Sequence, residues 1–431
     1  MLRQRSALWI VATCLTAVAA TGCAGPSGRV IRIDAALAEA GRYMIAAQSP
    51  DGAWRSATYG CFKADPALTP HVMSCLFFLP QTGDGALASF RRGAGYLSGF
   101  VGDDGRLDVG RRELLFPTFT AAAASRVVVL ERKTPRALLT QRAWLAYVLD
   151  RQLTERLGWR PADREYGGWG FALDVPRKPA PGRRRERFFE SNLVATVYGV
   201  AALHSADTPV DDAAFGQILT FARKCQNVSD DPSRADPAFD DGGFYFIPDD
   251  EVQNKAGVAG IDRFGRKRFA SYGTMTADGV RVLIRCGLGR DHPRVVAARR
   301  WLERNFSATQ NPGVFAADRE EIRNATYYYW TWAVSHAFLA LRARQIESPD
   351  GPIRWAEVLA DEILRRQRPD GSWVNGYTDA KEDDPLVATP FAAAALAICR
   401  AMMTGEYATI DGRCVSVRPG RRRSHPQTAS R

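Results

Sequence analysis

The seven residues Gln48-Ser49-Pro50-Asp51-Gly52-Ala53-Trp54 return near the other end of the chain as Gln367-Arg368-Pro369-Asp370-Gly371-Ser372-Trp373. Pro-Asp-Gly favours a tight turn, because glycine adopts a positive φ without steric cost. Four further turns that combine glycine with an aromatic or apolar residue lie between these two. They span residues 102–107, 166–171, 240–244 and 311–315. Six related turns at wide spacing indicate six copies of one structural unit.

Each turn separates two segments of different composition. The preceding segment is charged and has apolar residues at helical spacing, which is typical of a helix with one exposed face. The following segment is rich in alanine, threonine and aromatic residues and has few charges, which predicts a helix buried on all sides. The expected exposed helices are 34–48, 86–100, 136–153, 212–226, 293–305 and 353–367, and the buried ones are 68–79, 116–130, 191–203, 272–286, 327–341 and 386–402.

Six alternating pairs of exposed and buried helices are best satisfied by two concentric rings. The inner ring hides its apolar surface against the outer ring, whereas an open solenoid would need polar capping units at its ends. No terminal unit of that kind is visible in the sequence. We therefore predict an all-α protein, an (α/α)6 toroid in a single domain over residues 31–415.

The composition agrees with a globular protein and excludes some partners. The chain has 431 residues, of which 46% are hydrophobic, and a formal charge of +11. Seven of its arginines lie in residues 1–22 and 418–431, so the main body carries only about +4, too little to indicate nucleic-acid binding. The polar segment 416–431 is predicted to be a disordered basic tail.

The first residues resemble an export signal. Arg3 and Arg5 precede an apolar run over residues 7–20, and small residues lead to Cys23. This order is similar to a bacterial lipoprotein signal, in which residues 1–22 are removed and Cys23 is lipidated. The expected location is then extracytoplasmic, on a membrane through the lipid anchor. A plain secretion signal remains the alternative.

The other cysteines can pair in an oxidising compartment, but spacing alone does not choose among the pairings. They are Cys61, Cys75, Cys225, Cys286, Cys399 and Cys414. Cys61–Cys75 and Cys399–Cys414 are the pairs nearest in sequence. No Cys-x-x-Cys and no cysteine–histidine spacing typical of zinc occurs, so we expect no metal and no cofactor.

The two complete turns, 48–54 and 367–373, match the Q-x-x-D-G-x-W element known as the QW repeat. The chain therefore resembles the prenyltransferase/squalene-cyclase repeat superfamily from about residue 34 to residue 402. That resemblance implies an α/α toroid of the terpenoid-cyclase type, and a central cavity for an isoprenoid-like ligand. QW turns are structural in that superfamily, so they predict the fold more strongly than the activity.

The resemblance carries over to catalytic residues only in part. Class II terpenoid cyclases protonate an alkene with an Asp-x-Asp-Asp sequence, and the nearest match is Lys381-Glu382-Asp383-Asp384. This implies Asp384 and Asp383 as candidate acids, although Lys381 replaces the first acid. The alternative is that these carboxylates cap the next helix. The Asp-x-Cys zinc ligands of protein prenyltransferases are missing, and His336 would be the only remaining match.

The mouth of a toroid is formed by the ends of its inner helices, and such apolar cavities are the usual binding sites. The buried carboxylate Asp278 and the histidine His336 are further candidates for catalysis, with pairing to Arg281 or Arg285 and ordinary core packing as their alternatives. Five aromatics in the run 327–332 must face both the cavity and the outer ring. The predicted cavity-lining residues are His71, Thr118, Thr120, Glu190, Asn192, Thr196, Tyr272, Thr276, Tyr327, Tyr328, Tyr329, Trp330, Trp332 and Thr389.

Three functions remain open from the sequence. The first is a cyclase-like protein, an isomerase if catalytic, that takes a small apolar ligand. The second is an extracytoplasmic carbohydrate-active lyase or hydrolase acting on a glycan, because paired acids and aromatics also serve that chemistry. The third is a non-catalytic binding scaffold. A dry aromatic cavity favours the first, a cleft with two carboxylates the second, and a filled centre the third. The sequence does not indicate the oligomeric state, or a role for the arginine-rich loop 177–187.

Overall fold

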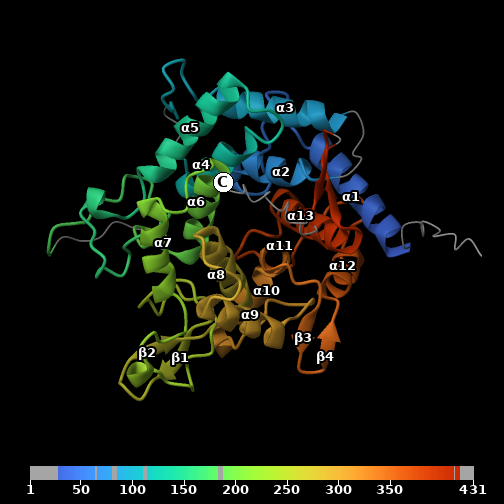
Figure 1. Cartoon of the computed structure of the whole chain (residues 1–431). Helices are drawn as coiled ribbons and strands as arrows, with labels where there is room; N and C mark the ends of the chain where they lie inside the picture. The colour runs from blue at the N-terminus through green and yellow to red at the C-terminus, as the bar shows by residue number, and fades with distance from the viewer. Residues whose placement is uncertain are drawn as a thin grey trace, which may run out of the picture.

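The computed structural model describes residues 28–63, 66–79, 85–109, 114–182, 188–411 and 413–417. The predicted signal peptide 1–22, Cys23, residues 183–187 of the arginine-rich loop and residues 418–431 of the predicted tail lie outside the described residues. The described chain is predominantly helical (Figure 1). The first helix begins at Gly28 and the last strand ends at Ser416, close to the predicted limits of the domain.

Six helices form a closed inner ring. They are α2 (Leu68–Leu76), α4 (Pro117–Val127), α6 (Leu193–Ser205), α8 (Gly273–Arg285), α11 (Tyr327–Leu341) and α13 (Pro385–Thr404). Each packs against the next in this order, and α13 packs against α2, which closes the ring (Figure 1). These helices correspond to the six segments predicted to be buried, although α6 and α13 end two residues beyond them and α13 begins one residue earlier. They consist mainly of small and aromatic residues, so neighbouring helices can approach closely on both sides.

The outer ring consists of the charged helices. They are α1 (Gly28–Ala46), α3 (Gly85–Ser98), α5 (Pro135–Leu149), α7 (Ala213–Lys224), α9 (Pro293–Asn305) and α12 (Trp355–Arg365). Each buries one apolar face, as α12 does with Trp355, Leu359 and Ile363. The helix α12 also contacts α1, so the outer ring brings the two ends of the domain together. The predicted (α/α)6 toroid is confirmed.

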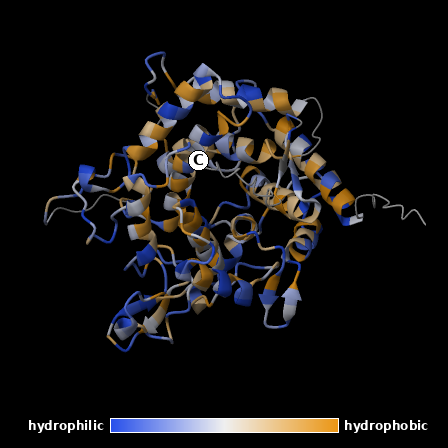
Figure 2. Cartoon of the chain, viewed as in Figure 1, coloured by the Kyte–Doolittle hydropathy of each residue, from blue (hydrophilic) through white to orange (hydrophobic). Residues whose placement is uncertain are grey.

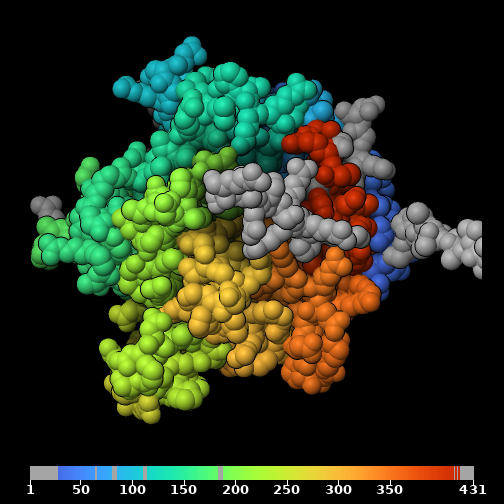
Figure 3. Space-filling view, viewed as in Figure 1, coloured from blue at the N-terminus to red at the C-terminus, as the bar shows by residue number. Residues whose placement is uncertain are grey.

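The remaining elements are short and lie in the connections. Three antiparallel hairpins occur, β1 (Val258–Ile261) with β2 (Lys267–Phe269), β3 (Ile346–Ser348) with β4 (Gly351–Ile353), and β5 (Glu406–Ala408) with β6 (Cys414–Ser416). The other elements of the described residues are the helix α10 (Glu320–Ala325) and the 3-10 helices η1 (Gly60–Phe62), η2 (Glu155–Leu157), η3 (Pro232–Arg234) and η4 (Ala317–Arg319). Hydrophilic and hydrophobic residues alternate along these peripheral segments (Figure 2), and the first two hairpins stand out from the body (Figure 3).

The glutamines of the turns join consecutive outer helices. Gln48 Nε2 donates to the carbonyl of Gly52 in its own turn and to that of Ser89 in the next outer helix, both at 2.9 Å. Gln367 Nε2 repeats this with Gly371 at 3.0 Å and with Ala36 at 2.9 Å. Since Ala36 belongs to α1, the second QW turn ties the last unit to the first. The repeat therefore specifies closure of the ring as well as its units.

The aromatic residues of four turns anchor the inner helix that follows each turn. The backbone N–H of Trp54, Trp169, Phe244 and Trp373 donates to a threonine hydroxyl in the following inner helix. The acceptors are Thr69 at 3.1 Å, Thr196 at 3.3 Å, Thr276 at 3.0 Å and Thr389 at 3.0 Å. Three of these threonines were expected to line the cavity. They are fully buried between turn and helix instead, because an orphan backbone N–H there needs an acceptor.

The six cysteines in the described residues are all free thiols. The pairs suggested by sequence proximity, Cys61–Cys75 and Cys399–Cys414, are therefore wrong. Cys75 and Cys399 are buried in inner helices, where they pack as small apolar side chains. Helix α13 is long and apolar enough to cross a membrane by length and composition, but 78% of its most apolar window is buried inside the toroid. We interpret it as a core helix.

Candidate functional site: an aromatic cavity in the inner ring

A cavity of about 290 Å³ occupies the end of the toroid at which the inner helices begin. All six inner helices, or the residues just before them, contribute to its wall. Aromatic rings make most of this wall. They belong to Phe62, Phe116, Phe119, Phe171, Tyr198, Phe246, Tyr272, Tyr329 and Phe391. The polar lining residues are few, namely His71, Lys255, Thr274, Thr326 and Glu382, and the remaining ones are apolar.

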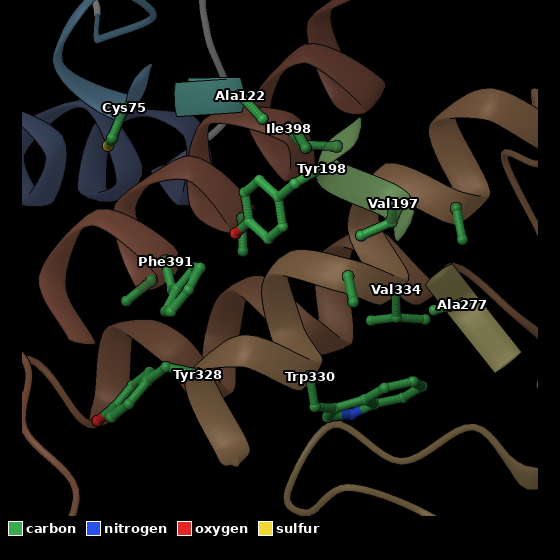
Figure 4. Packing of buried hydrophobic residues seen from close by; sticks show 14 of the residues in the cluster. Cys75, Ala122, Val197, Tyr198, Ala277, Tyr328, Trp330, Val334, Phe391 and Ile398 are labelled. Carbon is green, nitrogen blue, oxygen red and sulfur yellow. The ribbon is translucent and has the colours of Figure 1, made fainter. Parts of the chain in front are cut away.

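Helix α11 divides its aromatic residues between the two rings. The side chains of Tyr327, Tyr328 and Trp330 donate to backbone carbonyls of outer segments, those of Ala308, Val374 and Ser307. Figure 4 shows Trp330 and Tyr328 directed away from Tyr198 and Phe391. Tyr329 lines the cavity, and Trp332 lies one turn further along. The predicted division of the run 327–332 between the two rings is thus present, with Tyr329 as its residue on the cavity wall.

Glu382 is the one carboxylate on the cavity wall within the described residues. It is 1% exposed, and its two oxygens accept from the backbone N–H of Tyr328 at 2.8 Å, from that of Tyr329 at 2.7 Å and from Asn375 Nδ2 at 3.0 Å. The two backbone N–H groups belong to the first turn of α11 and have no partner within their helix. Burial raises the pKa of Glu382 to about 7, although the three donors favour the ionised form.

The two neighbouring acids have different roles. Asp384 is the N-cap of α13: its side chain accepts from the backbone N–H of Leu386 at 2.8 Å and is hydrogen-bonded by Ser56. Asp383 accepts from the hydroxyl of Tyr59 at 2.7 Å. Neither lines the cavity. The structure therefore gives Asp384 the capping role, the alternative to catalysis that the sequence left open, and places Glu382 at the cavity instead.

His71 is the histidine of the wall, and its pKa is also strongly shifted. It lies in α2, is buried, and its Nε2 is 3.0 Å from the carbonyl oxygen of Val387 in α13. The imidazole packs edge-on against Phe391, with the ring centroids 4.5 Å apart. Burial lowers the pKa of His71 to about 4, so the ring is neutral at pH 7. A neutral histidine preserves the apolar character of the wall.

Asp278 and His336 lie further along the inner helices than the cavity. Asp278 is completely buried, pairs with Arg281 (Nη1 to Oδ1 2.6 Å) and accepts from the hydroxyl of Tyr329. Burial raises its pKa despite these partners. The Nδ1 of His336 is 2.8 Å from the carbonyl oxygen of Trp332, and burial lowers the pKa of this histidine well below its usual value. Asp278 therefore reaches the cavity only through Tyr329.

Of the fourteen residues predicted to line the cavity, three do so: His71, Tyr272 and Tyr329. The others serve the scaffold or lie elsewhere. Thr118 donates to the carbonyl of Gly170 at 2.8 Å, Asn192 caps α6, and Thr120 is fully buried. Glu190 is half-buried in the loop before α6. Outside the wall lie Thr118, Thr120, Glu190, Asn192, Thr196, Thr276, Tyr327, Tyr328, Trp330, Trp332 and Thr389.

Sequence reasoning missed most of the aromatic wall. Phe119 and Phe391 occur in the first half of predicted buried helices and Tyr198 near the middle of one, so their position in each helix was an available signal. Nothing in the sequence singled out Glu382, because its neighbours Asp383 and Asp384 match the Asp-x-Asp-Asp motif better. Lys381 beside it adopts a positive φ of 58°. This left-handed backbone belongs to the bend between turn and helix that presents Glu382 to α11.

No group of three or more histidine, cysteine, aspartate or glutamate side chains able to hold a metal occurs among the described residues. The described wall offers two possible metal ligands, the carboxylate of Glu382 and the imidazole of His71, and the imidazole is directed at a carbonyl oxygen. Zinc sites use three or four protein ligands. The chemistry available at the wall is therefore proton transfer by Glu382 and the packing of aromatic faces on a ligand.

Comparisons with known proteins extend this description of the fold. No sequence profile of a known family matches the chain, and no curated protein sequence does. The ligand-free type II terpene cyclase MstE from Scytonema aligns with a TM-score of 0.50 at 14% identity, over 87% of this chain and 99% of that one. A variant of MstE in complex with its product, merosterolic acid A, gives 0.51 at 14% identity, over 87% and 98%.

A wild-type glycosidase aligns over 88% of this chain and 99% of its own at 12% identity, but with a TM-score of 0.48, too low to support an inference. At 14% identity, the similarity to MstE establishes the architecture and leaves the activity open. The QW-type turns, the closed double ring and this structural similarity lead to the same conclusion: the chain has the terpenoid-cyclase-like α/α toroid fold.

Proposed function

We propose that the aromatic cavity binds a small apolar ligand of the isoprenoid type. The observation that carries this proposal is the composition of the wall: nine aromatic rings, from inner helices and from the connections that precede them, surround about 290 Å³, with one carboxylate on the described wall. This volume is near the lower end of the range for ligand sites, about 300 Å³. Each square ångström of apolar ligand surface buried there contributes about 25 cal/mol.

The wall also suits a cyclisation. Protonated Glu382 can give its proton to an alkene carbon, which forms a C–H bond and leaves a carbocation. The carboxylate that remains is stabilised by the three donors already in place on its oxygens. Aromatic faces such as those of Tyr198 and Phe391 stabilise cations. Loss of a proton from the cyclised cation completes an isomerisation. MstE, which shares the fold, binds merosterolic acid A as its product.

The two other hypotheses receive less support. Glycoside hydrolysis uses two carboxylates on either side of the substrate, and the described wall offers Glu382 alone. A non-catalytic scaffold would have a filled centre, whereas here the N-terminal halves of the inner helices surround a cavity. We therefore favour the cyclase-like function.

The test of ligand binding is to fill the cavity. Val387 lies on the wall, so Val387→Trp should occupy the space and weaken binding of farnesol or geranylgeraniol at least about tenfold, or about 1.4 kcal/mol. Tryptophan fluorescence during titration measures the affinity. Val314→Trp is the matched control, because Val314 is 82% exposed. Equal binding by both variants, or no binding by the unmodified protein, would contradict the proposal.

We further propose that Cys23 is lipidated and holds the protein on an extracytoplasmic membrane surface. The support is the sequence alone: Arg3 and Arg5, the apolar run 7–20, and the small residues before Cys23. Replacing Cys23 by serine should abolish incorporation of labelled fatty acid and release the protein from the membrane fraction. Retained label in Cys23→Ser would show that the anchor lies elsewhere.

A further inference from the structure

The inner ring contains a second, chemically different region beyond the cavity. Aromatic rings separate the two: Tyr198 stacks on Trp332 with centroids 6.0 Å apart, and Trp332 meets Phe391 at 5.4 Å. We call these three rings the aromatic floor. The residues of α8 and α11 that follow the floor are Arg281, Arg285 and His336. The apolar cavity therefore gives way to a cationic region toward the C-terminal ends of the inner helices.

Arg281 is the most deeply buried cation of this region. It is 3% exposed, its Nη1 is 2.6 Å from Asp278 Oδ1, and its guanidinium lies 4.1 Å from the ring centroid of Trp332. Its Nε is buried and has no hydrogen-bond partner among the described residues. A guanidinium carries five N–H donors, so Asp278 satisfies only part of it.

Two further guanidinium groups lie in the same region with even fewer partners. Arg285 is one turn beyond Arg281 on α8, and its Nη1 is buried without a partner among the described residues. Arg126, in the last turn of α4, donates from Nε to the neutral hydroxyl of Ser205 at 3.3 Å. Burial, and then the charge of Arg281, lower the pKa of both arginines. Asp278 pairs with Arg281, and among the described residues no carboxylate forms an ion pair with Arg126 or Arg285.

The other titratable groups around them do not compensate this charge. His336 and His204 have lowered pKa values because of burial and of these arginines, and are therefore neutral at pH 7. The pKa of Tyr198 is raised by burial, so its hydroxyl is also neutral. With Asp278 counted, the cluster retains two positive charges. A buried charge without a counterion is costly, which indicates that a further anion belongs here.

Helix dipoles offer a partial alternative. Arg126 and Arg285 lie in the last turns of α4 and α8, where the dipole favours cations by about 0.3–1 kcal/mol each. This attraction stabilises the charge but supplies no acceptor to the unpartnered Nε of Arg281 and Nη1 of Arg285. Arg281 also lies inside α8 and not at its end. An oxyanion supplies both charge and several acceptors.

A path from solvent leads to Arg126. A depression of about 480 Å³ on this face is lined by Arg126, Ser74 and Ser205 together with Lys133, Glu131 and Arg413. Lys133 pairs with Asp207 at 2.9 Å, and Arg413 pairs with Asp411. Among the described residues, Arg126 is therefore the cation of this depression that lacks a carboxylate partner.

We propose that this region is an oxyanion site, in which a phosphate group enters through the depression and is held by Arg126 and Arg285 beneath the aromatic floor. The site is separate from the apolar cavity and does not depend on its function. The phosphate can come from solution as the free ion, or from the headgroup of an anionic lipid. Bidentate contacts from arginine suit such a group better than a lysine point charge.

Titration with inorganic phosphate at low ionic strength, followed by calorimetry, tests the site. We expect saturable binding, weakened about tenfold or more in Arg126→Gln and in Arg285→Gln, because each loses a charge-assisted hydrogen bond. Arg132→Gln is the control, because Arg132 is 73% exposed and pairs with Glu131. Vesicles of phosphatidylglycerol form a second arm: binding to vesicles that needs Arg126, with no binding of free phosphate, assigns the headgroup as the source.

A stability measurement separates this role from a purely structural one. Without oxyanions, Arg285→Met removes an uncompensated buried charge, so its melting temperature should rise above that of the unmodified protein. In phosphate the order should reverse, because only the unmodified protein gains a ligand. If the protein binds neither phosphate nor the vesicles, or if Arg285→Met lowers the melting temperature equally in both buffers, the arginines are structural and the proposal is wrong.

Discussion

Gly167→Ala should unfold the protein or cost more than about 3 kcal/mol of the 5–15 kcal/mol that stabilise a typical domain. Gly167 adopts a φ of 94°, and a Cβ added there would stand 1.9 Å from the carbonyl oxygen of Gln217 in α7. Neither atom can yield without moving the turn away from the next outer helix. Urea denaturation followed by circular dichroism measures the loss.

Gly182→Ala provides the matched control. Gly182 has a similar φ of 81°, but no atom of the described residues lies within 4 Å of the position that its Cβ would take. This variant carries the backbone strain of about 1–3 kcal/mol without the steric clash. If the two variants lose equal stability, close packing of the turn on the outer helix is not what makes glycine necessary at position 167.

The same close approach recurs in the other turns. A Cβ at Gly52 would meet the carbonyl oxygen of Arg92 at 2.4 Å, one at Gly242 that of Ala297 at 2.7 Å, and one at Gly371 that of Glu39 at 2.7 Å. Each contacted residue belongs to the next outer helix, α3, α9 and α1 respectively. The glycines therefore act together with the turn glutamines, which bond to carbonyls of the same helices.

This repeated geometry explains why the fold could be predicted. Turn type, glycine position and helix composition are local properties that recur along the chain, and the close approach of a turn glycine to a carbonyl of the next outer helix occurs in four of the six turns. The closed ring was predicted from the alternation of exposed and buried helices, and in the structure the bond from Gln367 to Ala36 of α1 secures that closure. The cavity depends instead on which side of each inner helix faces the centre. Those helices are buried on every side, so their composition does not identify the inward face.

The carboxylate on the cavity wall could not be predicted from the sequence. In the sequence Lys381-Glu382-Asp383-Asp384, Asp384 matches the family motif, yet it bonds to its own helix and to Ser56. Glu382 meets α11, a helix that begins more than fifty residues earlier in the chain. No local pattern encodes that contact. The roles of adjacent carboxylates were therefore decided by tertiary packing, which the sequence does not display.

Glu382→Gln should change the pH dependence of stability by roughly 3 kcal/mol between about pH 4.5 and pH 7. The folded protein holds the proton of Glu382 up to about pH 7, whereas the unfolded chain releases it near pH 4.5. The ionisation of Glu382 therefore makes the unmodified protein less stable as pH rises through this window. Glutamine carries no such proton, so the difference in unfolding free energy between the two proteins reports Glu382 alone.

The same variant tests the proposed chemistry. If Glu382 donates the proton to an isoprenoid, turnover by the unmodified protein should fall above about pH 7, and Glu382→Gln should lose activity at every pH. Binding of the same isoprenoid should persist, because the amide has nearly the shape of the acid. Unchanged turnover in Glu382→Gln would limit this residue to capping α11.

In the unmodified protein, His71 changes the unfolding free energy with pH in the direction opposite to Glu382. The pKa of His71 is lowered to about 4, so between about pH 6.5 and pH 4 the unfolded chain gains a proton that the folded state refuses. The contribution of His71 to stability is therefore lost as pH falls, over nearly the same pH range in which protonation of Glu382 increases stability.

We expect the unfolding free energy of the unmodified protein to vary little with pH. Glu382→Gln should lose stability as pH falls, and His71→Gln should lose stability as pH rises. A double variant without either slope would confirm that the two buried groups of one wall balance each other, and parallel profiles in all four proteins would refute it.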